Sequence, residues 1–347
     1  MLSITNRIEN FAALGNWLNA SLTELSEGKK PELAQIIDKA GAQNPWFTQS
    51  SIIQSLGAIA GWLNKQTLNE WVNRYYLTNP VQVKEVAVIM AGNVPVVNFH
   101  DFLSVLITGH KFIGKLSSQD KVLLPFLAEK LIELDPNWKS FISFTEDRLT
   151  HFDAVIATGS NNTSRYFEYY LGKYPHIIRK NRNSIAILTG NESEEELKTL
   201  YNDVFQYFGL GCRNVSMFLV PKGYDFPVLF DLWQGNPEPT DHNKYKNNYD
   251  YYRSLYLVNL QPFYDTGYVS VIRSESIASP ISVLHYKEYE DLEEVNGFLK
   301  SQQDQIQCVV SAVSWDTFPN VLPGQAQCPS ILDYPDGVDI VQFLLAL

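Results

Sequence analysis

Apolar residues recur at helical spacing along the first eighty positions of the chain. Every third or fourth residue is apolar in two stretches, from Ile8 to Leu18 and from Ile52 to Trp62, which is typical of helices that bury one face. A polar, turn-like segment from Glu27 to Pro31 lies between them. The pattern therefore predicts a helical N-terminal segment over residues 1–80.

Beyond Val83, short apolar runs alternate with amphipathic stretches. This order is typical of βαβ units, in which crossover helices join parallel strands. The expected strands cover residues 86–90, 112–115, 141–144, 154–157 and 184–188, and the expected helices lie around 102–106, 122–134, 164–171 and 194–208. The alternation predicts a dinucleotide-binding α/β domain over residues 81–208.

A second α/β region follows, with expected strands at 215–220, 268–272, 281–285 and 308–313. We expect a catalytic α/β domain over residues 209–315 and a C-terminal extension over 316–347. A helix-rich, tyrosine-rich insertion interrupts this region up to about Leu257. Its segment 235–250 is polar and rich in asparagine, which favours a surface loop or flap.

Composition excludes several classes of protein. The 347 residues carry a formal net charge of −11, which is unfavourable for binding nucleic acid. The N-terminus does not have the pattern of a signal peptide, and no apolar run is long enough for a membrane span. Three cysteines without a C-x-x-C pair fit a cytoplasmic protein with a reduced thiol, and the scattered histidines predict no metal site.

The first candidate site follows the expected strand 86–90, where the chain runs through Gly92-Asn93-Val94-Pro95. Ligands of open α/β sheets bind just beyond the carboxyl ends of parallel strands. The Asn93 amide there can donate a hydrogen bond to a developing oxyanion, although an asparagine in a simple turn is the alternative. The next strand ends at Lys115, which either holds a cofactor ribose or phosphate or is a solvated lysine.

The second candidate site is the turn Thr158-Gly159-Ser160, between an expected strand and an expected helix. Gly159 permits close approach of a ligand to the backbone, and Ser160 is a favourable N-cap. Free N–H groups at such a helix start can bind a pyrophosphate. With only one glycine, an ordinary helix cap remains an equal alternative.

The third candidate site is Gly209-Leu210-Gly211-Cys212, which precedes the expected strand 215–220. The two glycines leave room for a substrate carbonyl beside the sulfur, and a thiolate is a strong nucleophile. Arg213 would lower the pKa of the thiol if its side chain turned inward. A buried structural cysteine is the alternative, and Cys308, within the apolar run 308–313, fits that description better.

In this order, the three sites resemble the aldehyde-dehydrogenase superfamily, in the branch of the LuxC-type acyl-CoA (fatty-acid) reductases. The match covers about residues 84–222, with a weaker echo at 268–313 around Pro280-Ile281-Ser282-Val283-Leu284. The resemblance implies an aldehyde-dehydrogenase-like fold with two α/β domains that each contain a parallel sheet.

The resemblance also implies a role for each matching residue. Cys212 would be the acyl-accepting nucleophile, and Asn93 with the backbone N–H of Cys212 would form the oxyanion hole. The cofactor would be bound by Lys115, Ser117, Ser118, Gly159, Ser160 and, near the nicotinamide ribose, Glu275, although Ser276 lies at the family's spacing from Pro280.

Departures from the family pattern refine the expected reaction. Aldehyde-oxidising relatives carry a glutamate in a segment that corresponds to residues 178–184, which contain no carboxylate here. Its absence favours reduction over hydrolysis of the acyl-enzyme. Ser118 stands where NAD-preferring relatives carry a glutamate, so a 2′-phosphate would meet no like charge and NADPH is favoured, with NADH as the alternative. Ser164 replaces the family's usual second glycine.

These features predict an NADPH-dependent reductase that converts an acyl-CoA to an aldehyde. The alternatives are a non-catalytic subunit that binds nucleotide or acyl-CoA, and a cysteine acyl transferase. By resemblance, an acyl-activating enzyme is an expected partner, and a homo-oligomer is left open. The tyrosines between Tyr245 and Tyr256 would line an acyl tunnel or form a packed aromatic surface.

Overall fold

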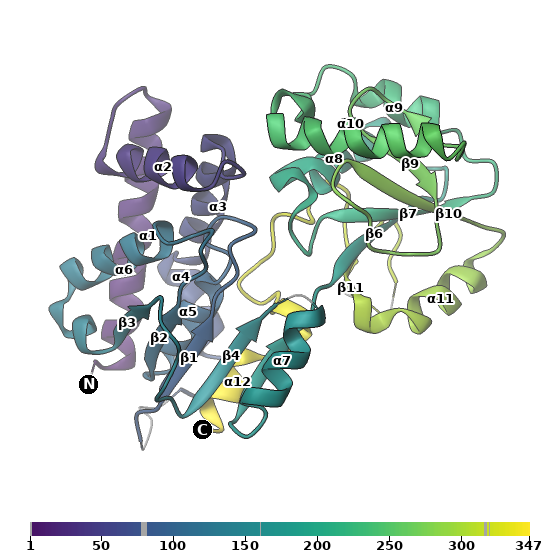
Figure 1. Ribbon diagram of the computed structural model, residues 1–347. Helices are drawn as coiled ribbons and strands as arrows, with labels where there is room; N and C mark the ends of the chain where they lie inside the picture. Colours follow the sequence, from purple (N-terminus) through teal and green to yellow (C-terminus); the bar gives the residue numbers. More distant parts are fainter. Residues whose placement is uncertain (1, 78–81, 160, 316–317, 319) are drawn as a thin grey trace. The chain divides into compact units, whose positions relative to one another are not determined.

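The computed structural model describes residues 2–77, 82–159, 161–315, 318 and 320–347. Within them the chain divides into two units, residues 1–181 with 330–347 and residues 182–329. Each unit is built around one sheet (Figure 1). The predicted α/β class, with a helical N-terminal segment, is confirmed.

The sheet of the first unit is parallel throughout and has the strand order β3-β2-β1-β4-β5. Its strands are β1 (Glu85–Ile89), β2 (Lys111–Lys115), β3 (Ile142–Thr145), β4 (Ala154–Thr158) and β5 (His176–Arg179). Helices α5 (Phe99–Ile107), α6 (Leu123–Leu134) and α7 (Asn161–Leu171) connect β1 to β2, β2 to β3 and β4 to β5. The strand order reverses between β1 and β4, and such a switch point is where open α/β sheets bind ligands.

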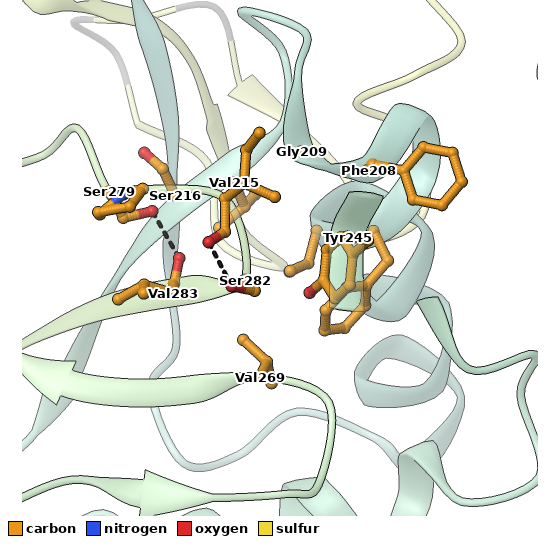
Figure 2. A pocket seen from close by; sticks show the side chains of 13 residues that line it. Phe208, Gly209, Val215, Ser216, Tyr245, Val269, Ser279, Ser282 and Val283 are labelled. Atoms are coloured by element: carbon orange, nitrogen blue, oxygen red, sulfur yellow. Dashed lines mark hydrogen bonds between the residues drawn. The ribbon is translucent and has the colours of Figure 1, made fainter. Parts of the chain in front are cut away.

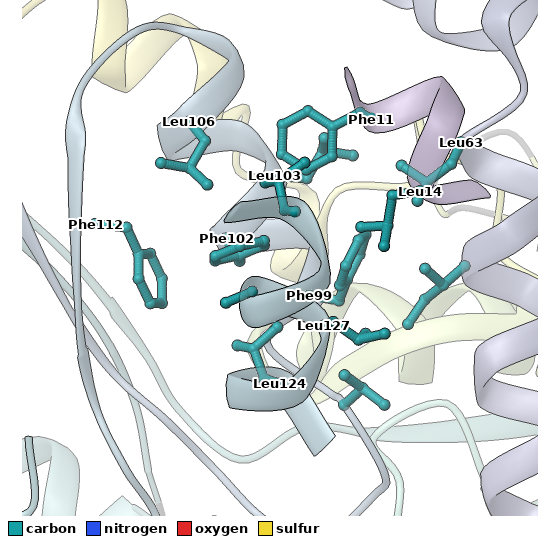
Figure 3. Close-up of a cluster of buried hydrophobic side chains, with 14 of the residues drawn as sticks. Phe11, Leu14, Leu63, Phe99, Phe102, Leu103, Leu106, Phe112, Leu124 and Leu127 are labelled. Carbon is teal, nitrogen blue, oxygen red and sulfur yellow. The ribbon is translucent and has the colours of Figure 1, made fainter. Parts of the chain in front are cut away.

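The N-terminal helices pack on this sheet unit. They are α1 (Ile4–Ser26), α2 (Glu32–Gln43), α3 (Gln49–Trp62) and α4 (Lys65–Val72), and the short C-terminal helix α12 (Ile340–Leu345) contacts α5. Phe11 of α1, Phe102 of α5 and Phe112 of β2 belong to one buried cluster, drawn in Figure 3. The Phe102 and Phe112 rings meet edge to face, with centroids 5.0 Å apart. Burial of these large rings therefore joins the helical segment to the sheet.

The sheet of the second unit has the order β12-β11-β6-β7-β10-β9-β8, with only the edge strand β8 antiparallel. Its strands are β6 (Asn183–Ile187), β7 (Val215–Pro221), β8 (Tyr264–Asp265), β9 (Ser270–Arg273), β10 (Val283–Tyr289), β11 (Ile306–Val310) and β12 (Asn320–Val321). Its helices are α8 (Glu194–Phe205), α9 (Phe226–Trp233), α10 (Asn243–Val258) and α11 (Leu292–Ser301). Ser193 and Glu196 form a reciprocal capping box that starts α8.

The division into units differs from the boundary predicted at residues 208 and 209. It lies between Asn181 and Arg182, because β6 pairs with β7 and β11 and so belongs to the second sheet. The predicted C-terminal extension is also split, since β12 joins the second sheet while residues 330–347 return to the first unit. The predicted boundary between residues 80 and 81 lies outside the described residues.

Two local expectations need correction. The segment 235–250 is only partly a loop, because α10 begins at Asn243 with the His242 imidazole accepting the Tyr245 N–H. Burial of Tyr245 and Tyr249 supplies the apolar face that favours a helix there. Strand β5 was missing from the expected set, because four residues ending in a charged arginine carry little periodicity.

Candidate active site

The loop that follows β1 carries Asn93 and packs closely on the turn after β2. A Cβ atom added at Gly92 would lie 2.6 Å from the Ser117 Oγ and 2.8 Å from the Gln119 Cβ. These separations are too short for any side chain, so glycine is required for the two loops to approach. The first unit thus brings Gly92, next to Asn93, against Ser117.

A buried hydrogen-bond network fixes the Asn93 loop at both ends. The Ala91 N–H donates to the Asn98 side-chain oxygen at 2.8 Å, and the Asn98 amide donates to Asp101 at 3.1 Å. Farther along, the Val96 N–H donates to the buried Asp120 carboxylate at 3.2 Å. Val96 has φ of +54°, a left-handed conformation unusual for a β-branched residue. Such strain, held by surrounding contacts, is common at functional loops.

Asp101 in turn is paired with Arg179 at the end of β5. The two terminal guanidinium nitrogens, Nη1 and Nη2, each donate to one carboxylate oxygen, at 2.8 and 2.7 Å, and both side chains are buried. Burial alone would raise the pKa of Asp101, but the charge and hydrogen bonds of Arg179 outweigh it and lower this pKa. Arg179 lies within the segment where aldehyde-oxidising relatives carry their glutamate. This segment therefore contributes a buried cation that is paired with Asp101.

The cofactor candidates on β2 lie at the strand's carboxyl end. The Lys115 Nζ donates to the Glu146 carbonyl, Ser117 caps its own turn by accepting the Gln119 N–H at 3.2 Å, and Ser118 is exposed. Lys115 pairs in register with Ile89, the last residue of β1. These three residues therefore lie along the same edge of the sheet as the Asn93 loop.

The turn after β4 differs in detail from the expectation. A Cβ at Gly159 would lie 2.9 Å from the Phe167 ring and 3.1 Å from Thr163, so the glycine allows α7 to pack closely on the strand end. Ser160 lies outside the described residues. The buried Thr158 Oγ1 atom has no hydrogen-bond partner in the described part of the chain. A buried hydroxyl without a partner is costly, so Thr158 is a candidate donor to a ligand that sequence reasoning did not assign.

Cys212 lies exposed on a turn of the second unit, just before β7. Three consecutive residues before it, Tyr207, Phe208 and Gly209, have φ of +53°, +58° and +76°. Left-handed backbone costs roughly 1–2 kcal/mol for each non-glycine residue. The predicted helix 194–208 therefore ends early, at Phe205, and a strained turn leads to the cysteine. None of the three cysteines forms a disulfide, and Cys308 is buried as predicted.

Hydrogen bonds hold the turn on both sides of Cys212. The Gly211 N–H donates to the Asn214 side-chain oxygen at 2.8 Å, and the Asn214 N–H donates to the Gly211 carbonyl at 3.1 Å. The Ser184 hydroxyl donates to the Cys212 carbonyl at 3.1 Å. Sequence reasoning missed both Asn214 and Ser184, because their partners are backbone atoms that no motif identifies.

The Arg213 side chain contacts the backbone of a segment distant in sequence. Its Nε donates to the Ala326 carbonyl at 2.5 Å, and the Ala326 N–H donates to the buried Asp203 carboxylate at 2.9 Å. Asp203 also accepts the Gly324 N–H at 2.6 Å. Burial raises the pKa of Asp203 to about 6, despite these hydrogen bonds and the nearby Arg213. The contacts dock the segment 324–326 beside the Cys212 turn.

Glu275 follows β9 and forms a two-point ion pair with Lys287, at 2.9 and 2.7 Å. The carboxylate is exposed, whereas the neighbouring Ser276 hydroxyl donates to the Ala278 carbonyl at 3.1 Å. The second unit therefore leaves the carboxylate of Glu275 accessible to solvent, while it turns Ser276 onto its own loop.

A small pocket of the second unit lies beside Gly209, with Tyr245 and Val269 in its lining (Figure 2). Its cavity of about 30 Å³ has room for one or two water molecules. Tyr245, Tyr249 and Tyr256 are all buried, and Phe208 contacts the His242 ring with centroids 4.5 Å apart. These tyrosines match the packed-aromatic alternative.

Two negative observations apply to the described residues. Among them, no three histidine, cysteine or acidic side chains are grouped so as to hold a metal ion. None of their helices is both long and apolar enough to cross a membrane.

Comparisons with known proteins place the fold. An aldehyde dehydrogenase from Burkholderia cenocepacia, described as putative, is 13% identical with a TM-score of 0.65, over 91% of this chain and 76% of that one. Aldehyde dehydrogenase 21 from Physcomitrella patens, solved with succinate, is 12% identical with a TM-score of 0.67, over 98% and 84%. The NAD+ complex of a Bacillus cereus aldehyde dehydrogenase is 13% identical with a TM-score of 0.62, over 91% and 73%. The protein thus has the fold of the aldehyde-dehydrogenase superfamily.

The family match is more specific. Residues 60–214, which include the Asn93 loop, the turn after β4 and Cys212, match the model of the acyl-CoA reductase (LuxC) family. The predicted resemblance to this family is confirmed over these residues, which make up less than half of the chain. The match supports an oxidoreductase that acts on acyl or aldehyde groups. No curated protein matches the sequence.

Proposed function

We propose that this protein reduces an acyl-CoA to an aldehyde with NADPH, through an acyl thioester on Cys212. The observation that carries the proposal is the exposed Cys212 on a strained turn, whose flanking peptide groups are held by the Asn214 N–H and the Ser184 hydroxyl. The family match, which extends through this turn to residue 214, supports the same chemistry.

The reaction begins with the Cys212 thiolate, which attacks the thioester carbonyl and displaces CoA as its thiolate. The carbonyl oxygen carries negative charge in the tetrahedral stages, and we assign its stabilisation to the Asn93 side chain and the Cys212 backbone N–H. In a trans peptide group the C=O and N–H point in opposite directions. The bond from Asn214 to the Gly211 carbonyl therefore turns the Cys212 N–H away from Asn214.

The residues of the first unit fit a nicotinamide dinucleotide. The switch point between β1 and β4, the requirement for glycine at Gly92 and the unpartnered Thr158 hydroxyl all favour a ligand there. NADPH bound there would supply the hydride that reduces the acyl group, and the Cys212 sulfur that carries this group would leave as a thiolate when the aldehyde is released. We assign Lys115, Ser117 and Ser118 to the adenosine half, Gly159 and Ser160 to the pyrophosphate, and Glu275 to the nicotinamide ribose.

The residues in the segment where aldehyde-oxidising relatives carry their glutamate favour reduction of the acyl-enzyme over its hydrolysis. Hydrolysis of the acyl-enzyme would need a base to activate water. In aldehyde-oxidising relatives this base is a glutamate, but the corresponding segment here contains Arg179, which is paired with Asp101. A carboxylate engaged in a two-point ion pair is a weak base, because Arg179 lowers the pKa of Asp101. The acyl-enzyme is therefore preserved for reduction.

The test measures acyl transfer and reduction separately. Incubation with acyl-CoA but no NADPH should release CoA and leave one acyl group on Cys212, detected by mass spectrometry of the peptides. Cys212→Ala should abolish both the adduct and NADPH oxidation. Cys328→Ala removes the other exposed cysteine of the same unit and should leave both unchanged. Full activity in Cys212→Ala would refute the proposal.

A second candidate is a non-catalytic subunit that binds nucleotide or acyl-CoA. The observation that favours it is the ion pair between Glu275 and Lys287, which engages the carboxylate assigned to the nicotinamide ribose. This candidate predicts NADPH binding by calorimetry without NADPH oxidation for any acyl-CoA chain length. A cysteine acyl transferase would instead release CoA without binding NADPH.

A further inference from the structure

Both peptide groups that flank Cys212 are anchored to neighbouring side chains or backbone of the second unit. The group between Gly211 and Cys212 is held through the Gly211 carbonyl, which accepts the Asn214 N–H at 3.1 Å. The group between Cys212 and Arg213 is held through the Cys212 carbonyl, which accepts the Ser184 hydroxyl at 3.1 Å. The backbone on both sides of the sulfur therefore has a fixed orientation.

The Ser184 anchor is part of a buried chain of hydrogen bonds. Ser184 lies on β6 and Cys308 on the adjacent β11, and both side chains are fully buried. The Cys308 sulfur is 3.1 Å from the Ser184 Oγ. Since the single hydroxyl proton of Ser184 goes to the Cys212 carbonyl, the Cys308 S–H is the donor to Ser184. Two strands of the sheet thus hold the carbonyl of Cys212.

Asn214 fixes the other side of the turn, and both its side-chain oxygen and its side-chain NH₂ group form hydrogen bonds. Its oxygen accepts the Gly211 N–H at 2.8 Å. Its NH₂ group lies within hydrogen-bond distance of three carbonyls around the end of α8, those of Asp203, Val204 and Gln206, at 3.2, 3.2 and 2.8 Å. A buried amide with all these partners links the left-handed turn to the end of the helix.

We propose that Ser184 and Asn214 are positioning residues for Cys212, and that Cys308 orients the Ser184 hydroxyl. Neither Ser184 nor Asn214 touches the substrate in this proposal, which rests on the proposed function. They hold the Cys212 backbone so that its N–H and sulfur keep one arrangement throughout acyl transfer. Much of an enzyme's rate enhancement comes from holding the reacting groups in a fixed geometry, and a small displacement of these groups lowers the rate strongly.

The chain offers a matched control for Ser184. Ser216 is a buried serine on the adjacent strand β7, and its hydroxyl donates to the Ile277 carbonyl at 2.7 Å. Ser184→Ala and Ser216→Ala therefore each remove one buried hydroxyl that is bonded to a backbone carbonyl. Only the first of these bonds ends on Cys212. Ser184→Thr keeps the hydroxyl and should restore the wild-type behaviour.

The experiment combines a kinetic and a structural measurement on the full-length protein. We expect Ser184→Ala to slow CoA release from acyl-CoA, without NADPH, by about tenfold, with the acyl-CoA KM unchanged. Hydrogen–deuterium exchange of the amides in residues 209–214 should become faster in Ser184→Ala and not in Ser216→Ala. If Ser184→Ala does not fold, Ser184→Cys replaces the hydroxyl with a weaker donor, and the same differences are expected at smaller size.

The outcomes separate this proposal from the proposed function. Equal rates of CoA release in Ser184→Ala and Ser216→Ala, beside an active wild-type protein, would overturn the positioning role alone. Equal exchange in residues 209–214 would overturn it as well. A wild-type protein that releases no CoA and forms no adduct on Cys212 would instead refute the proposed function, and the positioning role with it.

Discussion

Arg179 and Asp101 lie 78 residues apart in the sequence and form a buried two-point ion pair in the first unit. Asp101 also accepts the Asn98 amide, whose oxygen holds the Ala91 N–H at the start of the Asn93 loop. The pair therefore links the end of β5 to the loop that follows β1. Both strand ends lie on the edge of the sheet where we place the cofactor.

Arg179→Ala should destabilise the protein strongly. Removal of one partner leaves the Asp101 carboxylate buried without its counter-charge, which typically costs about 3–5 kcal/mol. Denaturant unfolding would measure this loss. Lys222→Ala, which breaks the exposed pair with Glu290, is the control and should leave stability unchanged. Equal stability of the two variants would contradict the structural role of the buried pair.

Gly92→Ala should impair cofactor binding. The added Cβ would lie 2.6 Å from the Ser117 Oγ and would force the Asn93 loop and the Ser117 turn apart. We expect a higher Kd for NADPH in calorimetry and a lower rate of acyl transfer. Gly57→Ala lies in α3, where an added Cβ meets nothing within 4 Å, and should be neutral or slightly stabilising. An unchanged NADPH affinity in Gly92→Ala would argue against cofactor binding at this edge.

Ser118→Glu should shift the cofactor preference from NADPH to NADH. The exposed Ser118 offers no negative charge to a 2′-phosphate, whereas a carboxylate would repel the phosphate and accept a 2′-hydroxyl. The ratio of kcat/KM for NADPH to that for NADH should fall by about tenfold or more, which corresponds to roughly 1.4 kcal/mol. Ser118→Ala adds no charge and should keep the ratio. If both variants keep it, the assignment of Ser118 to the 2′-phosphate is incorrect.

Asp203 should make the stability of the second unit depend on pH. Its pKa of about 6 in the folded protein lies above its ordinary value of 3.8, so between about pH 6 and pH 4 the folded state holds a proton that the unfolded state has not yet bound. The Asp203 contribution to stability therefore increases as the pH falls from about 6 to about 4, by on the order of 3 kcal/mol. We expect the unfolding free energy of the wild type to increase relative to that of Asp203→Asn as the pH falls across this range. A constant difference between them would contradict the raised pKa.

The sequence indicated much of the framework because its signals are local. Apolar residues at period two or about 3.6 marked β1, β2, β4, β6 and β7 and most of the helices, and the glycines before Cys212 marked the turn on which we place the nucleophile. Short or charged elements were missed, such as β5 with its terminal Arg179. The polar composition of residues 235–250 predicts a loop, whereas the buried side chains of Tyr245 and Tyr249 form the apolar face of the helix α10.

The supports of the site depended on the tertiary structure. Ser184, Asn214 and Cys308 acquire their roles only when β6, β7 and β11 come together, since hydrogen bonds to backbone carbonyls leave no sequence pattern. The same holds for Asp101 and Arg179, which meet through the pairing of strands distant in sequence. The sequence by itself indicated most of the elements, and it set Cys212 on a glycine turn apart from Cys308 in an apolar run. The fold decided which buried partners hold that turn, because burial and hydrogen-bond geometry arise only from contacts between distant segments.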